Sequence, residues 1–140
     1  MWVVAHAVSG AAVGAVVAAP EAALPLAVVA HAVLDLVPHW DYTRTRMPVS
    51  WAYLDVGGSA LFALALVAAG APWVVPVCAL LAALPDVDSV GLVIPSLGRR
   101  QWFPSHWRRF PHGDCSVACG LALQAIVIAV SLGALLAGLA

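Results

Sequence analysis

Long apolar runs separated by short polar links are the feature that most limits how this chain can fold. The runs cover residues 2–19, 24–37, 51–70, 73–84 and 115–139. Only 9% of the 140 residues are charged and 64% are hydrophobic, whereas a soluble domain usually carries about 25% charged residues. Because a helix needs roughly 20 apolar residues to cross a bilayer, the pattern predicts an all-α membrane protein with about five transmembrane helices.

Two of the runs, residues 24–37 and 73–84, are too short for a full crossing. At about 1.5 Å per residue the first of them reaches roughly 21 Å, against about 30 Å of hydrocarbon. Each ends in a similar turn with a proline, LVPHWD at residues 36–41 and ALPDVD at residues 83–88. Proline disfavours helical geometry in the residue before it, so we expect both turns to begin below the membrane surface.

The repeated turn predicts an internal duplication within a single transmembrane domain. The domain would cover residues 1–140, with a first helix pair at about 1–42, a second pair at about 51–90 and a last helix at about 115–139. Both pairs would start on the same side of the membrane, as parallel repeats do. Their polar turns would then lie at the same membrane face.

The first run has further features of a membrane helix. No Lys or Arg precedes it, so it lacks the basic start of a signal peptide and we expect a retained helix. Gly10 and Gly14 form a G-x-x-x-G pattern, which is typical of closely packed membrane helices. We expect the turn to the next helix at Pro20 and Glu21.

All six Arg residues fall in two links, and this sets the predicted orientation. The links hold Arg44 and Arg46, and Arg99, Arg100, Arg108 and Arg109. Cytoplasmic links carry an excess of basic residues, which predicts a multi-pass membrane protein with a cytoplasmic N-terminus and an external C-terminus. With no Lys and a net charge of −1, a nucleic-acid partner is not expected.

The second basic link, at about 99–111, combines Arg with Trp and Phe in the string RRQWFPSHWRRF. Aromatic and basic residues together are typical of a segment at the level of lipid headgroups on an anionic leaflet. Membrane lipids are therefore the expected partners. A simple positive-inside anchor is the alternative interpretation.

In this topology the His and Asp residues gather near the cytoplasmic ends of the helices. His31, Asp35 and His39 are spaced four apart and share one helix face. Six Asp residues placed close together would resist ionisation unless cations neutralise them. Imidazole and carboxylate ligands together suit Zn²⁺, Mn²⁺ or Fe²⁺. The number of ligands predicts two or more divalent metal ions, with zinc as the first choice.

The candidate metal ligands come from both repeats and from the links. They are His6, His31, Asp35, His39, Asp41, Asp55, Asp86, Asp88 and His112. Two simpler roles stay open. His6 could be a lone histidine at the membrane interface, and Asp114 could be no more than the N-cap of the last helix.

On these residues the chain resembles the YdjM-like family of inner-membrane proteins described as metal-dependent hydrolases. The shared features are His6 followed by small residues, the L-P-D-x-D turn at residues 84–88, and the later histidines His106 and His112. The resemblance covers most of the chain. It implies hydrolysis at a membrane-embedded metal site.

A local pattern adds a reaction type. The spacing of His31, Asp35 and His39 is similar to ligand patterns of zinc-dependent phospholipase C. That similarity implies phosphoester hydrolysis at a multi-zinc centre, and only these three positions carry it.

The leading hypothesis is therefore a metal-dependent hydrolase that acts on a phosphoester, most readily that of a lipid. Its candidate catalytic residues are Arg108, Arg109 and His106, and we expect an arginine to hold the phosphate. The alternative is a non-catalytic metal-binding accessory subunit with protein partners in a larger membrane complex. Ion transport is a weaker third option, because no polar residue is expected in the outer half of any span.

Overall fold

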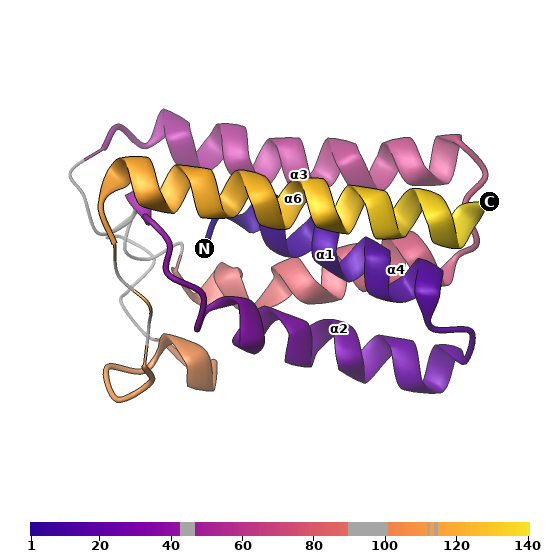
Figure 1. Cartoon of the computed structure of the whole chain (residues 1–140), viewed down its shortest axis with the longest axis horizontal. Helices are drawn as coiled ribbons and strands as arrows, with labels where there is room; N and C mark the ends of the chain where they lie inside the picture. Colours follow the sequence, from indigo (N-terminus) through magenta and orange to yellow (C-terminus); the bar gives the residue numbers. More distant parts are fainter. Residues whose placement is uncertain (43–46, 90–100, 112, 114) are drawn as a thin grey trace.

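The computed structural model describes residues 1–42, 47–89, 101–111, 113 and 115–140 as a helical bundle, with no strand in these ranges. Figure 1 shows the helices running nearly side by side. The elements in chain order are α1 (Val3–Val16), α2 (Pro20–Leu34), α3 (Ser50–Ala68), α4 (Val74–Ala83), the 3₁₀ helices η2 (Leu84–Ser89) and η4 (Pro104–His106), and α6 (Val117–Leu139).

Helix α1 is the central element of the bundle. It packs against α2, α3, α4 and α6, and ten of its fourteen residues are buried. Most of these are Ala, Gly or Val, so the helix can be surrounded on all sides without bulky side chains separating it from its neighbours.

The glycines of α1 let α4 approach closely, in agreement with the G-x-x-x-G prediction. A Cβ atom on Gly10 would lie 2.5 Å from the Cβ of Ala82, and one on Gly14 would lie 2.9 Å from the Cα of Val75. Atoms at these separations overlap, so only glycine fits at either position. This contact holds the end of α4, and η2 after it, against α1.

Only two of the described helices, α3 with 19 residues and α6 with 23, are long and apolar enough to cross a membrane. Both expose most of their apolar surface. The other apolar helices α1, α2 and α4 have 14, 15 and 10 residues. The predicted number of about five transmembrane helices is therefore not confirmed, because helix length falls short in three cases.

Helix α2 begins and ends earlier than the apolar run predicts. Pro20 occupies the first turn and Glu21 follows it, and both residues favour a helix start. The predicted turn at Pro20 and Glu21 is therefore wrong, because these residues open the helix. The helix ends at Leu34, and a turn continues from Asp35 toward His39.

The proline-containing turns that follow α2 and α4 lie at one end of the bundle, on the left of Figure 1. The starts of α1, α3 and α6 meet the ends of α2 and α4 there. Helix α6 is joined to this end by Gln124, which accepts a hydrogen bond from the Trp2 amide at 2.9 Å and donates one to the Trp40 carbonyl at 3.1 Å. A buried polar side chain in an apolar helix thus contacts both the residue before α1 and the segment after α2.

The close contact of α1 with α4 predicts a large difference between two glycine substitutions. Gly10→Ala should lower the free energy of unfolding in detergent by about 1–3 kcal/mol, since the added methyl group overlaps α4. The matched control is Gly133→Ala in α6, where a Cβ meets no atom within 4 Å. That control should be neutral or stabilising by up to about 1 kcal/mol. Equal thermal midpoints for the two variants would contradict the packing.

Candidate metal centre

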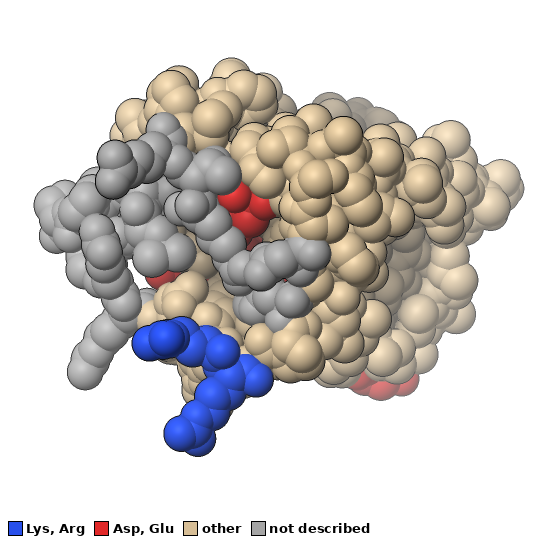
Figure 2. Space-filling view, turned by 60° about the vertical axis from the view of Figure 1, so that its left-hand side comes forward, with Lys and Arg blue, Asp and Glu red and all other residues tan. Residues whose placement is uncertain are grey.

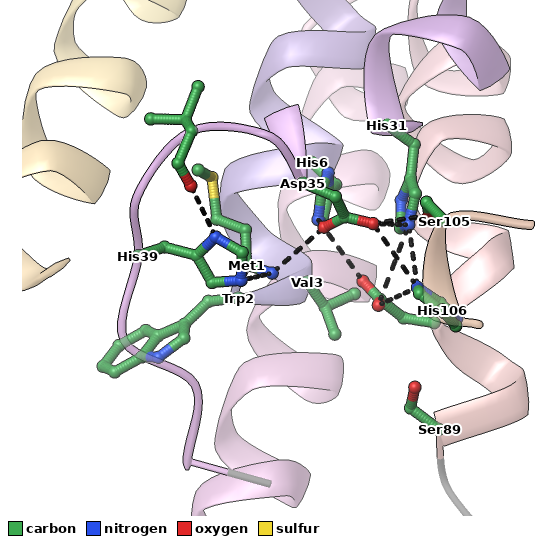
Figure 3. Close-up of polar contacts among 12 residues, drawn as sticks. Met1, Trp2, Val3, His6, His31, Asp35, His39, Ser89, Ser105 and His106 are labelled. Atoms are coloured by element: carbon green, nitrogen blue, oxygen red, sulfur yellow. Dashed lines mark hydrogen bonds and ion pairs between the residues drawn. The ribbon is translucent and has the colours of Figure 1, made fainter. Parts of the chain in front are cut away.

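Five polar side chains from four elements converge at the polar end of the bundle, and we call them the His–Asp cluster. They are His6 of α1, His31 and Asp35 of α2 and its cap, Asp86 of η2, and His106 of η4. Figure 3 shows the side chains of His6, His31, Asp35 and His106 pointing toward one another. They come from sequence positions up to 100 residues apart (106 − 6), so only the tertiary fold brings them together.

The two carboxylates lie between the three imidazole rings. Asp35 Oδ1 lies 3.4 Å from His6 Nε2, and Asp35 Oδ2 lies 3.2 Å from His31 Nε2 and 3.6 Å from His106 Nε2. Asp86 contacts the same three nitrogens, at 3.9 Å, 4.0 Å and 3.5 Å respectively. Each carboxylate therefore faces the Nε2 atoms of all three histidines.

His6 has no hydrogen-bond partner for either ring nitrogen, although its side chain is fully buried. Its ring stacks on that of His31 with 3.8 Å between centroids, which fixes the ring plane and leaves Nε2 directed at the carboxylates. Asp86 Oδ2, 3.9 Å away, is also buried without a hydrogen bond. A buried polar atom without a partner is costly and calls for an explanation such as an ion.

His31 and His106 direct lone pairs at each other. His31 Nδ1 lies 2.7 Å from the Ala82 carbonyl oxygen, and since a carbonyl only accepts, Nδ1 carries the proton. His106 Nδ1 lies 2.5 Å from Asp88 Oδ1, so its Nδ1 donates as well. When both rings are neutral, the two Nε2 atoms, 3.1 Å apart, are then both acceptors. This contact is favourable only with a proton or a cation between them.

Asp88 acts on His106 rather than facing the other members of the cluster. One of its oxygens pairs with His106 Nδ1, and the other accepts the amides of Trp102 and Phe103 at 2.9 and 2.8 Å. A carboxylate in this position fixes the tautomer and orientation of a ligating histidine. The sequence predicts Asp88 as a ligand, whereas in the structure Asp88 contacts the Nδ1 side of His106, away from the ligand atoms.

Ser105 is a member of the site that the sequence analysis missed. It is fully buried, and its hydroxyl donates to Asp35 Oδ2 at 2.6 Å. Its position directly before His106 is the only signal that could have indicated it, because a lone serine in an Arg- and Trp-rich link carries no pattern of its own.

His39 and Asp55 lie apart from the ring of ligand atoms. His39 Nδ1 lies 2.7 Å from the Val37 carbonyl, and its Nε2 lies 2.8 Å from the amino group of Met1, which in turn lies 3.2 Å from Asp35 Oδ1. Asp55 accepts the amides of Val3 and Val4 at 2.8 Å. Its contacts are those of a cap on the first turn of α1.

The remaining candidates are placed as follows. Asp41 is partly exposed and belongs to neither ligand group found among the described residues. Arg108 and Arg109 are exposed and account for the blue side chains of Figure 2, at the same end as acidic side chains that lie recessed. His112 lies outside the described residues.

The His–Asp cluster has the donor atoms and spacing of a metal site. Two overlapping groups, His6, His31 and Asp35 and then His31, Asp86 and His106, each bring their ligand atoms within 4.8 Å of one another. In a tetrahedral zinc site, bonds of about 2.0–2.1 Å place neighbouring ligands roughly 3.3–3.4 Å apart. The nitrogen–oxygen separations of 3.2 to 4.0 Å are of this size, so the cluster could hold a metal ion.

The sharing of His31 bears on the number of ions. One imidazole nitrogen has one lone pair, so His31 Nε2 ligates one ion. The two groups are therefore not two independent three-ligand sites. The described distances account for one ion, and the sequence-based expectation of two or more stays a prediction.

Comparison of the chain with protein-family models, with curated proteins and with solved structures found no match. The resemblance to the YdjM-like family therefore remains a prediction that rests on short motifs. The chemistry of the site has to be argued from its own residues.

The cluster predicts how the stability of the metal-free protein depends on pH. Burial raises the pKa of Asp86 to about 7, whereas the carboxyl of the unfolded chain has a pKa near 3.9. The folded state therefore holds the proton more tightly. Stability should fall on the order of 1 kcal/mol as pH rises from 6 to 8, measured as the thermal midpoint with a chelator present.

The control for this measurement is Asp86→Asn, which cannot ionise. It should remove most of the pH dependence, and the difference between the two proteins isolates Asp86 from other groups that titrate in this range. Zinc should reverse the trend in the wild type, since a bound cation favours the ionised carboxylate. Identical pH profiles for both proteins would contradict the assignment.

Proposed function

We propose that the chain is a membrane-embedded, metal-dependent hydrolase that cleaves a phosphoester of a membrane lipid at the cytoplasmic interface. The observation that carries this proposal is His6, whose two buried ring nitrogens lack hydrogen bonds while two carboxylates face it. A buried histidine that only supports a fold normally has a partner for at least one nitrogen. A ligating histidine needs a free lone pair.

The five side chains of the His–Asp cluster would hold the ion. Three imidazoles with two carboxylates favour zinc, with manganese or iron as the alternatives. A bound divalent ion supplies Lewis-acid activation of a phosphoester and of water. The other residues act on the ligands, because Asp88 orients His106 and Ser105 holds Asp35.

The basic segment beside the site supplies the case for a phosphoester. Arg108 and Arg109 lie two and three residues after His106. Trp102 and Trp107 of the same segment are about half exposed. Arginine binds phosphate through a planar fork of donors, and exposed tryptophans are typical of the headgroup region. A lipid phosphate would thus meet positive charge next to the ligands.

Two helices that could cross a membrane, α3 and α6, weakly support a membrane location. The inner membrane, multiple crossings and a cytoplasmic site form part of the proposal, and their support is the restriction of Arg to two links.

The proposal predicts that single members of the cluster are needed for both metal and turnover. His6→Ala and Asp86→Asn should each lower the zinc content of the purified protein and abolish cleavage in a panel of phosphomonoesters, phosphodiesters and phospholipids, since each removes a ligand. Elemental analysis measures the metal content, and mass spectrometry of the reaction products measures cleavage of each substrate. The matched control, Asp41→Asn, should retain both.

Two outcomes would reject the proposal that the chain is an enzyme. One is a wild type that holds metal and cleaves no member of the panel, while His6→Ala affects stability alone. In that event the metal is structural, and the accessory subunit becomes the better description. The other outcome is a wild type that binds no divalent metal.

Arg108 should separate phosphate binding from metal binding. Arg108→Ala should retain full metal content and reduce turnover by about 10–100-fold, which corresponds to losing a charged hydrogen bond of about 1.4–2.8 kcal/mol. Arg108→Lys should recover part of the loss. Equal turnover in the wild type, Arg108→Ala and Arg108→Lys would show that Arg108 does not bind the phosphate.

A further inference from the structure

A groove separate from the His–Asp cluster lies between the start of α1 and the first half of α3. Its volume is about 180 Å³. We call it the aromatic groove, and its walls are formed by Trp2, Val4, Tyr42, Trp51, Leu54, Asp55 and Gly58. The groove plays no part in the metal site described above.

The chemistry of the groove favours hydrocarbon. Its surface is formed mainly by aromatic and aliphatic groups. The one charged residue, Asp55, already has both oxygens engaged, because it accepts hydrogen bonds from Val3, Val4 and the Tyr42 hydroxyl. A polar ligand would therefore find no free hydrogen-bonding group on Asp55, whereas an apolar chain would gain free energy by leaving water.

The groove is continuous with the apolar outer face of α3. Leu54, which lines it, is 72% exposed, and the adjacent Tyr53 is 63% exposed. Helix α3 is also one of the two helices that could cross a membrane. The first contact available to this face is then the acyl region of the bilayer, with Trp51 near the headgroups.

The groove also lies close to the proposed metal site along the chain. Trp2 and Val4 line the groove, and the amino group of Met1 lies 3.2 Å from Asp35 Oδ1. Three residues of backbone span at most about 11 Å. A single lipid molecule can therefore reach both places.

We propose that the aromatic groove holds one acyl chain of a membrane phospholipid whose phosphate faces the His–Asp cluster, an inference that rests on the proposed function for the role of the phosphate. The groove thereby selects long-chain lipids over soluble phosphoesters. Its volume suits a short stretch of hydrocarbon and excludes a helix of another protein, which has a diameter of about 10 Å.

Two adjacent glycines provide a matched pair of variants. A Cβ atom on Gly58 or on Gly57 would meet no atom within 4 Å, so a side chain can begin at either position without a clash. Only Gly58 lines the groove. Both substitutions replace glycine within α3 and therefore favour the helix. Gly58→Leu blocks the groove, and Gly57→Leu adds the same side chain beside it.

The test uses a phosphatidylglycerol with a photoreactive diazirine on an acyl carbon near the glycerol, incorporated with the full-length protein in vesicles. Mass spectrometry should locate labels on the peptides around Trp2 and Leu54. Gly58→Leu should reduce this labelling by roughly tenfold, since each excluded methylene contributes a factor of about four. Gly57→Leu should label like the wild type.

A second measurement needs no variant. A diazirine at the end of the acyl chain should label the exposed faces of α3 and α6 in place of the groove. Equal labelling of the groove by both probes, or unchanged labelling in Gly58→Leu, would overturn the proposal. A third outcome would also overturn it: the wild type is a dimer, and Gly58→Leu dissociates the dimer without reducing the labelling. In that case a second copy of the chain would occupy the groove.

Turnover distinguishes this inference from the proposed function. If Gly58→Leu cleaves a soluble phosphodiester normally but loses activity on long-chain lipid, both the groove proposal and the hydrolase proposal stand. If it cleaves both substrates like the wild type, the groove proposal fails and the hydrolase remains. If the wild type cleaves nothing while Gly58→Leu still loses the label, the groove remains a lipid site and the hydrolase fails.

Discussion

The facing lone pairs of His31 and His106 are the interaction on which the polar end of the bundle depends. Each ring is committed through its Nδ1 atom, one to the Ala82 carbonyl and the other to Asp88, so neither can turn to relieve the 3.1 Å contact between the Nε2 atoms. Asp35 and Asp86 lie beside this contact, and a cation is the natural complement because it favours the ionised form of both carboxyls. In a chain with so few charged residues, such a concentration of buried polar atoms carries a large desolvation cost, and a ligand that binds all of them offsets it.

The apolar part of the chain serves to bring these groups together. Gly10 and Gly14 let α4 lie directly against α1, and η2 follows α4 without a loop, so the position of Asp86 relative to His6 is set by helix packing. His106 has weaker backbone support because η4 has only three residues. Its orientation depends instead on Asp88 and on the two amides that hold Asp88. The centre thus combines ligands on packed helices with one ligand held by hydrogen bonds.

Sequence patterns predict the helical class and the gathering of His and Asp at one end, because apolar periodicity and the position of turns are local properties. They do not distinguish ligands from supporting residues. Asp55 and Asp86 look equivalent in the sequence, yet Asp55 caps α1 while Asp86 faces the imidazoles. The number of spanning helices is likewise not confirmed, since a short apolar run can be buried by protein as well as by lipid. Ser105 had no signal beyond its position next to His106, because its role arises only from contact with Asp35.

The spread of the ligands along the chain has a consequence for biosynthesis. His6 lies in α1 and His106 in η4, so the centre cannot assemble until the residues between them have been made. At about 5–20 residues per second, the 100 residues between them take roughly 5–20 s to synthesise. During this interval His6, Asp35 and Asp86 have to be accommodated without their final partner. Insertion of the early helices therefore cannot draw on the binding energy of a metal ion held by the complete set, and that energy becomes available only as a late step that closes the finished bundle.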